Sequence, residues 1–156
     1  MKNNRSFTLI ESVVAIFMLT VGTVGAFSLI QKTITFTAVT SSQLKAAYLA
    51  QEGIELVRNI RDGNYVERST WNDGLTGCAD GCEADYNDGV FSSYDDLFLM
   101  IDSGFYNYDS GTETIFKRKI TIVPQTNILE VAVEVSWTER GRGHTLAAQT
   151  ELYNWK

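Results

Sequence analysis

The chain has 156 residues, of which 44% are hydrophobic, and this length allows one globular unit with an appendage rather than two full domains. Thirteen basic residues against nineteen acidic residues give a net charge of −6. This excess of acid argues against a duplex-binding surface, which must neutralise phosphates, so we expect no direct nucleic-acid partner.

An uncharged segment near the amino terminus is long enough to cross a membrane. Residues 12–31 contain no charged side chain and are rich in Val, Ile, Leu, Phe and Ala, which makes about 30 Å of apolar helix. Lys2 and Arg5 precede it, and positive charge on the cytoplasmic side predicts an exported remainder. The alternative is a secretory signal peptide, but the Gly25–Ala26 neighbourhood is a poor cleavage site for that class.

Glu11 stands at the head of this apolar segment, where a carboxylate is out of place in a plain membrane anchor. Placing an ionised carboxylate near a bilayer costs about 2–3 kcal/mol unless a cation offsets the charge. Two interpretations stay open on chemistry alone. Either Glu11 has a functional cationic partner, or it sits at the headgroup level beside Arg5.

The residues Arg5-Ser-Phe-Thr-Leu-Ile-Glu11, followed by the apolar segment, resemble the amino terminus of type IV pilins and type II secretion pseudopilins. The resemblance implies that a prepilin peptidase cleaves between Ser6 and Phe7 and that Phe7 is then N-methylated. It also implies that Glu11 pairs with the Phe7 amine of a neighbouring subunit. Such a pair would set the stagger of the helices, because an unmatched buried charge costs several kcal/mol. One departure is Ser6, since the family usually has glycine before the cleaved bond.

The same resemblance implies the division of the amino-terminal region, the partners of the protein and its cellular location. Residues 1–6 would be a leader and 7–31 the transmembrane and assembly helix. The expected partners are other pilin or pseudopilin subunits, prepilin peptidase, an inner-membrane assembly platform and the lipid bilayer. The expected location is the bacterial cytoplasmic (inner) membrane, crossed once with the carboxyl-terminal head exported, and then a cell-surface pilus or a periplasmic pseudopilus.

The segment 32–61 continues as an amphipathic helix. Apolar residues recur at spacings of three and four and form one stripe. The stripe comprises Ala46, Leu49, Ala50, Gly53, Val57 and Ile60. We expect the helix to end at Asp62–Asn64, because Gly and Asn tolerate the left-handed conformation. A break is expected at Thr33–Thr40, whose β-branched residues lower helix propensity.

Residues 62–113 contain twelve acidic side chains and one arginine, without a sustained apolar period, and are expected to form a long surface loop. Both cysteines, Cys78 and Cys82, lie here, and an exported domain favours a disulfide between them. Two thiols without a nearby histidine do not make a zinc site, so no metal is assigned. Asp85–Gly89 resembles a calcium loop, but Tyr86 falls where an oxygen ligand is needed, which leaves only a non-EF-hand site open.

The final segment, 114–156, alternates apolar and polar residues, most clearly from Leu129 to Trp137, and predicts about three antiparallel strands. The amphipathic helix would cover their apolar face. The predicted fold is therefore α+β and pilin-like, with a long amino-terminal helix, membrane-embedded in its first half, and the acidic loop between helix and sheet. Cysteines in the middle rather than near the carboxyl terminus favour a minor pilin or pseudopilin.

No catalytic residue or cofactor is predicted, and we expect no enzyme. His144, the sole histidine, lies at a strand edge without a catalytic triad, and the chain has no P-loop or dinucleotide-binding turn. The competing interpretation is a single-pass anchored binding or adhesion module that displays the tyrosines of the acidic loop. These are Tyr86, Tyr94, Tyr106 and Tyr108. A basic patch stays open as a nucleic-acid contact. It comprises Lys117, Lys119, Arg140 and Arg142.

Overall fold

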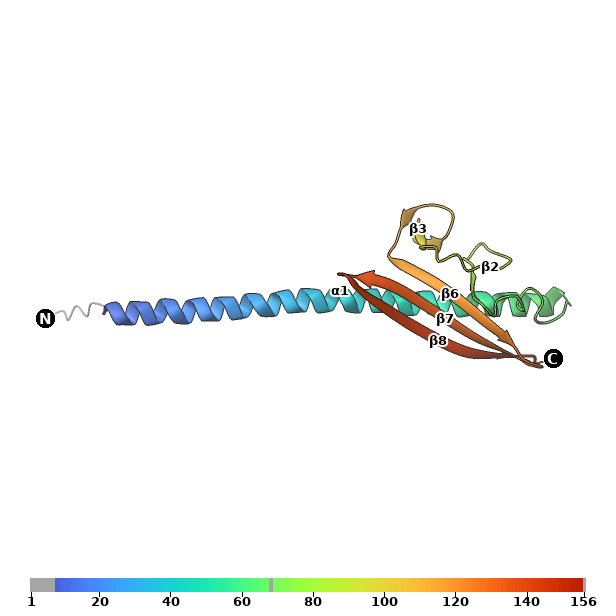
Figure 1. Cartoon of the computed structure of the whole chain (residues 1–156), viewed down its shortest axis with the longest axis horizontal. Helices are drawn as coiled ribbons and strands as arrows, with labels where there is room; N and C mark the ends of the chain where they lie inside the picture. Colours follow the sequence, from blue (N-terminus) through green and yellow to red (C-terminus); the bar gives the residue numbers. More distant parts are fainter. Residues whose placement is uncertain (1–7, 68, 156) are drawn as a thin grey trace. The chain divides into compact units, whose positions relative to one another are not determined.

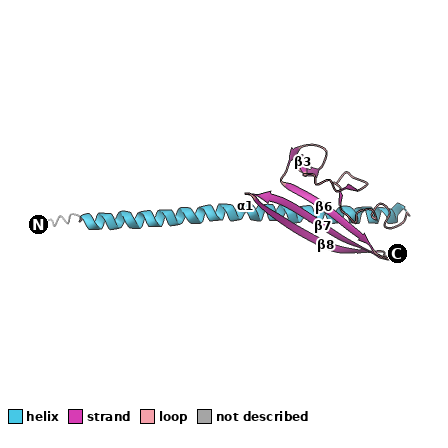
Figure 2. Ribbon diagram, viewed as in Figure 1, coloured by secondary structure: helices cyan, strands magenta, loops and turns pink. Residues whose placement is uncertain are grey.

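The computed structural model describes residues 8–67 and 69–155, and the chain divides into two compact units, Met1–Ser41 and Ser42–Lys156. We call the second unit the head. Helix α1 (Leu9–Glu67) contributes its first part to the first unit and its last part to the head. The strands of the described residues all lie in the head (Figure 2). The expected α+β architecture, with a long amino-terminal helix and antiparallel sheet, is confirmed.

Helix α1 runs through Thr33–Thr40 without the break expected there. The threonine hydroxyls supply the reason, because each of three donates to the carbonyl one turn earlier. Thr33 donates to Leu29 O at 3.0 Å, Thr35 to Gln31 O at 2.9 Å, and Thr37 to Thr33 O at 2.9 Å. These bonds satisfy the hydroxyls within the helix, so β-branching lowers its propensity without ending it.

Helix α1 also continues past the stop expected at Asp62–Asn64 and ends at Glu67. Tyr65 explains the extra length, since it is buried and its ring centroid lies 4.6 Å from that of Trp155. Its hydroxyl donates to Asn154 Oδ1 at 2.8 Å. Tertiary packing therefore maintains a further helical turn that propensity alone disfavours.

Three long antiparallel strands form the main layer of the head: β6 (Phe116–Pro124), β7 (Ile128–Glu139) and β8 (Arg142–Tyr153). Each pairs with its neighbour in chain order. Side chains alternate between a buried inner face and an outer face, as the period-two pattern predicts. In Figure 1 these strands lie along the part of α1 that belongs to the head.

The inner face of this sheet packs on the apolar stripe of α1 and forms the core. Gly53 permits the close approach, since a Cβ at this position would lie 2.8 Å from Val133 Cγ1. The fully buried members include Ala46, Leu49, Ala50 and Val57 of the helix and Ile120, Ile122, Leu129, Val131, Val133 and Val135 of the sheet. Burying each large aliphatic side chain contributes about 1.5–3 kcal/mol, so this contact holds the head together.

The acidic segment is folded rather than an open surface loop. Strands β1 (Cys82–Glu83) and β2 (Ser92–Ser93) extend the main sheet in the order β2-β1-β6-β7-β8, whereas β3 (Met100–Asp102), β4 (Phe105–Asn107) and β5 (Thr112–Glu113) form a second sheet in the order β4-β3-β5. Leu75 and Leu99 are fully buried. The expected three strands correspond to β6–β8, and the added strands were missed because runs so short have no measurable period.

Candidate functional site

Helix α1 begins with a side-chain cap. Thr8 Oγ1 accepts a hydrogen bond from the Glu11 backbone N–H at 3.3 Å, and the Thr8 carbonyl accepts one from the Ser12 N–H at 3.2 Å. Thr8 is therefore the N-cap and Glu11 the third helical residue, which is the spacing of a capping box. This role of Thr8 was not predicted, although Thr-x-x-Glu before an apolar run is the usual signal for it.

Glu11 lies exposed in the first turn of α1. The positive end of the helix dipole stabilises a carboxylate there by about 0.3–1 kcal/mol. This is less than the roughly 2–3 kcal/mol that an ionised carboxylate costs near a bilayer, so the helix start offsets only part of the cost. Ser6 and Phe7, the predicted cleavage and methylation site, lie outside the described residues.

The first unit exposes a continuous apolar helix surface. Leu9, Phe17, Leu19 and Phe27 are each more than 60% exposed. Helix α1 also contains a stretch that is long and apolar enough to cross a membrane. An apolar surface of this size is stable in a bilayer or against other apolar helices, and unfavourable in water.

The hydroxyls within this apolar stretch are bonded inside the helix. Thr20 donates to Phe17 O at 2.8 Å and Thr23 donates to Leu19 O at 2.7 Å. Hydrocarbon offers no hydrogen-bond partner, and an unsatisfied polar group there costs several kcal/mol. These two bonds make the threonines compatible with an apolar environment.

A family model described as the prokaryotic N-terminal methylation motif matches residues 1–27. Comparisons with curated proteins and with solved structures give no match. The matched segment contains the cap, Glu11 and the exposed apolar surface. This chain is type IV pilin-like. The pilin motif implies processing by prepilin peptidase and assembly with other pilin subunits, and it points to a family of structural subunits.

The head of this pilin-like chain contains a disulfide between Cys78 and Cys82, whose Cα atoms lie 5.3 Å apart. Both residues are buried, and the Ile122 N–H donates to Cys78 O at 3.0 Å. Gly81 adopts a φ of +109°, and a Cβ there would meet the side chain of Lys119. The disulfide loop therefore lies against β6 and fixes the acidic segment to the main sheet.

The oxygen-rich run Asp85–Gly89 folds around backbone N–H groups. Asp85 is 1% exposed; its Oδ1 accepts from the Asn87 N–H at 2.8 Å and its Oδ2 from the Tyr108 N–H at 3.2 Å. Asp88 Oδ2 accepts from the Asp85 N–H at 2.8 Å. Among residues 8–67 and 69–155, no three His, Cys, Asp or Glu side chains are grouped as metal ligands.

Two of the four predicted tyrosines belong to the core. Tyr106 and Tyr108 pack against the buried cluster, and the Tyr108 hydroxyl donates to Arg118 O at 3.3 Å. Burial raises the pKa of Tyr108 to about 12. Tyr94 donates to Asp96 Oδ1 at 2.7 Å. The acidic segment therefore does not present its tyrosines as one surface.

The predicted basic patch is divided by local pairing. Lys117 Nζ pairs with the Asp96 carboxylate, and this hydrogen bond lowers the pKa of Asp96 below its usual range. Lys119 Nζ lies 5.4 Å from the centroid of the Tyr94 ring, a cation–π contact. Both lysines are thus engaged within the head, and Arg140 and Arg142 lie exposed at the far end of β7 and the start of β8.

Arg118 is a fully buried arginine that joins the helix to the sheet. Its Nη2 donates to Ala84 O at 2.6 Å and its Nη1 donates to Leu49 O at 3.3 Å. Nη1 also lies 3.4 Å from Glu52 Oε1. One guanidinium therefore connects α1, the acidic segment and β6. This role of Arg118 was not predicted from the sequence.

His144 is a packing residue. Its ring stacks on Trp137 with 5.2 Å between the centroids and 17° between the planes. The two residues are directly opposite on β8 and β7. This position agrees with the expectation of a strand-edge histidine.

Glu83 carries a buried carboxylate in β1. It is 4% exposed, and its Oε1 accepts a hydrogen bond from the Leu97 N–H at 3.0 Å. Burial raises the pKa of Glu83 above its ordinary value of 4.5, because removing water disfavours the ionised form. The folded head therefore binds a proton at this site more readily than the unfolded chain does.

We expect Glu83→Gln to stabilise the head at pH 7. In the native chain the protonation of Glu83 should raise stability as the pH falls toward 4.5, and the glutamine variant should lack this increase. The sign follows from the raised pKa, since the protonated form favours folding. Asp96→Asn is the control of opposite sign. The pKa of the native Asp96 is lowered, so its ionised carboxylate contributes stability near neutral pH, and this contribution is lost at acid pH. Denaturation midpoints of the full chain in detergent, followed by tryptophan fluorescence, measure both. A pH profile unchanged by Glu83→Gln would contradict the assignment.

Proposed function

We propose that this chain is a minor pilin or pseudopilin, a structural subunit of a type IV pilus or a type II secretion filament. Prepilin peptidase would remove residues 1–6 before Phe7, and the apolar part of α1 would leave the bilayer to pack among the helices of other subunits. The observation that carries the proposal is the methylation motif placed at the capped start of an exposed apolar helix.

In this proposal Glu11 sets the register between subunits by pairing with the amine of Phe7 in a neighbour. A carboxylate held among apolar helices is costly unless a cation meets it, so wrong staggers are disfavoured by several kcal/mol. The capping-box spacing of Thr8 and Glu11 offers a competing explanation, in which Glu11 is kept only because it stabilises the start of the helix. The two explanations differ in what they require of the side chain.

Glutamine separates them, because the third position of a capping box accepts Glu or Gln whereas an ion pair needs the charge. We expect Glu11→Gln to insert in the membrane normally and to reduce the protein recovered in sheared filaments by roughly tenfold or more. Thr8→Ala is the matched control, since it removes the cap, worth about 1 kcal/mol, and keeps the charge. Equal recovery of Glu11→Gln and the native chain would reject the ion-pair role.

The amino-terminal mass of the protein tests the proposal as a whole. It should be measured in membranes and in sheared filaments, from cells with and without prepilin peptidase. We expect a peptidase-dependent start at N-methylated Phe7, with that form present in the filament fraction. An intact Met1 in cells that contain the peptidase would overturn the proposal and leave an anchored binding module as the better account.

A further inference from the structure

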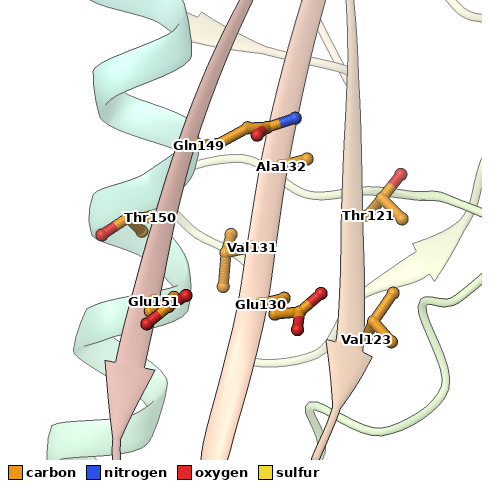
Figure 3. Close-up of a pocket in the computed structure, with 8 residues that line it drawn as sticks. All are labelled: Thr121, Val123, Glu130, Val131, Ala132, Gln149, Thr150 and Glu151. Carbon is orange, nitrogen blue, oxygen red and sulfur yellow. The ribbon is translucent and has the colours of Figure 1, made fainter.

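Strand β8 forms an open edge of the main sheet. It is the last strand in the order β2-β1-β6-β7-β8 and has 12 residues, whereas β2 at the other edge has 2. Figure 3 shows the order of the strands near this edge, with Thr121 on β6, Ala132 on β7 and Gln149 on β8. An edge strand presents unpaired backbone N–H and C=O groups that another strand can bind. The length of β8 concentrates these groups on one edge.

The pairing with β7 determines which residues of β8 face this edge. The Asn154 N–H donates to Asn127 O at 2.9 Å, and these two residues continue the β7–β8 register. The turn agrees, because both residues between the strands have positive φ, as in a type I′ hairpin, which makes Glu139 and Arg142 a hydrogen-bonded pair. Hydrogen-bonded pairs alternate along an antiparallel ladder, so the even-numbered residues of β8 bond to β7 and the odd-numbered residues face outward. The outward-facing residues are Gly143, Thr145, Ala147, Gln149, Glu151 and Tyr153.

This edge is open and unprotected. The outward-facing residues are all exposed, and within residues 8–67 and 69–155 no backbone group from outside the ladder bonds to theirs. Natural edge strands are usually protected by lysine, proline or a bulge. From Arg142 to Tyr153 there is no proline or lysine, and the register with β7 is continuous. Arg142 itself faces Glu139 of the same hairpin. The backbone of β8 is therefore available for pairing with another strand.

The inner side of the same edge is incompletely covered. Leu146 and Ala148 of β8 are half-buried, whereas Val135 and Val133, which lie directly opposite them on β7, are fully buried. A further strand beside β8 would extend the inner face of the sheet and remove these apolar side chains from water. The edge thus gains both hydrogen bonds and apolar burial when a strand is added.

Strand β8 is complementary to a second copy of itself. Two identical antiparallel strands are related by a two-fold axis, and an axis at Ala148 is the one that sets every outward-facing residue opposite another outward-facing residue. Each such residue then donates and accepts one bond, which gives about twelve backbone hydrogen bonds, as many as a typical interface contains. No like charges face each other. The facing pairs are Gly143 with Tyr153, Thr145 with Glu151, and Ala147 with Gln149.

We propose that two heads of this chain pair through β8, as adjacent antiparallel strands about a two-fold axis at Ala148. The main sheets of the two copies then form one continuous sheet. The partner is a second copy of this chain, because the long open edge is complementary to itself and a two-fold contact uses the same surface on both copies. The pair uses the head alone, so this inference does not rest on the proposed function.

Cysteine cross-linking of the full chain, in membranes and in detergent micelles, maps the contact. The two native cysteines form the Cys78–Cys82 disulfide, so an introduced thiol has no native competitor. Ala148→Cys lies opposite itself across the axis, at a Cα separation of about 4.5 Å, which a disulfide accepts. We expect a covalent dimer on mild oxidation. Gly143→Cys is the matched control, because its own counterpart lies about 33 Å away and it should stay monomeric. Mixed with Tyr153→Cys, it should form a heterodimer.

Proline substitution tests the hydrogen bonds. Ala147→Pro removes an N–H that faces away from β7, so the head should fold, but the second copy loses a donor and meets the proline ring. We expect the dimer dissociation constant, measured by sedimentation in micelles, to rise at least about tenfold. Gln149→Ala removes only a side chain and should leave the dimer unchanged. Native tryptophan fluorescence verifies that each head is folded, and the cross-linking pattern decides the question if the proline variant does not fold.

Three results would overturn the proposal. One is a dimer that survives Ala147→Pro, since it would arise from the apolar surface of α1. The others are equal cross-linking of Ala148→Cys and Gly143→Cys, and cross-links of Ala148→Cys only to a different protein. These measurements require neither cleavage before Phe7 nor a filament. Failure of the proposed function is therefore distinguishable from failure of the β8 contact.

Discussion

Replacing Arg118 by alanine is expected to destabilise the head by about 3–5 kcal/mol, the cost of removing one partner from a buried charged network. The change removes the donors to Leu49 O and Ala84 O and leaves Glu52 without its cation. It also opens a cavity, because Arg118 is fully buried. Denaturant unfolding of the full chain in detergent, followed by tryptophan fluorescence, measures the loss. The three tryptophans all lie in the head, so the signal reports that unit.

Two further variants define the cause of this loss. Arg118→Met refills the volume and should cost less than Arg118→Ala, although both carbonyls stay unpaired. Arg58→Ala removes an exposed arginine from its pair with Glu55, which is 2.5 Å long, and should change stability by no more than about 0.5 kcal/mol. A loss below about 1 kcal/mol for Arg118→Ala would mean that the buried guanidinium is not a net stabiliser.

The second large effect is expected at Gly53, where α1 crosses the sheet. A methyl group in Gly53→Ala would lie 2.8 Å from Val133 Cγ1, so helix and sheet must separate. Overpacking of this kind costs about 1–3 kcal/mol, which exceeds the gain of about 1 kcal/mol from helix propensity. Gly63→Ala is the same change in the same helix with nothing within 4 Å, and it should stabilise by about 0.5–1 kcal/mol. The opposite signs are the test, and two stabilised variants would show that the core yields at Gly53.

Much of the fold could be predicted because its elements are long. The apolar stripe of α1 and the apolar–polar alternation of β7 each repeat several times, which makes their periods recognisable. Each period predicted the buried face correctly. The continuity of α1 through Thr33–Thr40 and its end at Glu67 could not be predicted in the same way. The threonine run and Asp62–Asn64 both disfavour helix by propensity. The threonine hydroxyls bond to carbonyls of the same helix, which propensity does not count, and the burial of Tyr65 depends on Asn154, far along the chain.

The residues of the candidate site also differ in how far the sequence predicts their roles. Glu11 was predicted as a site residue because a carboxylate at the head of an apolar segment is out of place in a plain membrane anchor. The N-cap role of Thr8 was not predicted, although its spacing to Glu11 is that of a capping box. Arg118 also had a signal, since the alternation that turns Phe116 and Ile120 inward turns Arg118 inward too. Asp85 had none, because its burial depends on backbone N–H groups brought to it by Asn87 and the distant Tyr108.

The contact between Tyr65 and the last residues of the chain sets the order in which the head can be completed. The Trp155 N–H donates to the Tyr65 hydroxyl at 3.0 Å, so residues 90 positions apart close the structure. Synthesis proceeds from the amino terminus, and the apolar stripe of α1 therefore exists before β6, β7 and β8 have been made. A nascent or prematurely terminated chain presents that stripe bare, which makes it a substrate for chaperones and proteases until the final strand arrives.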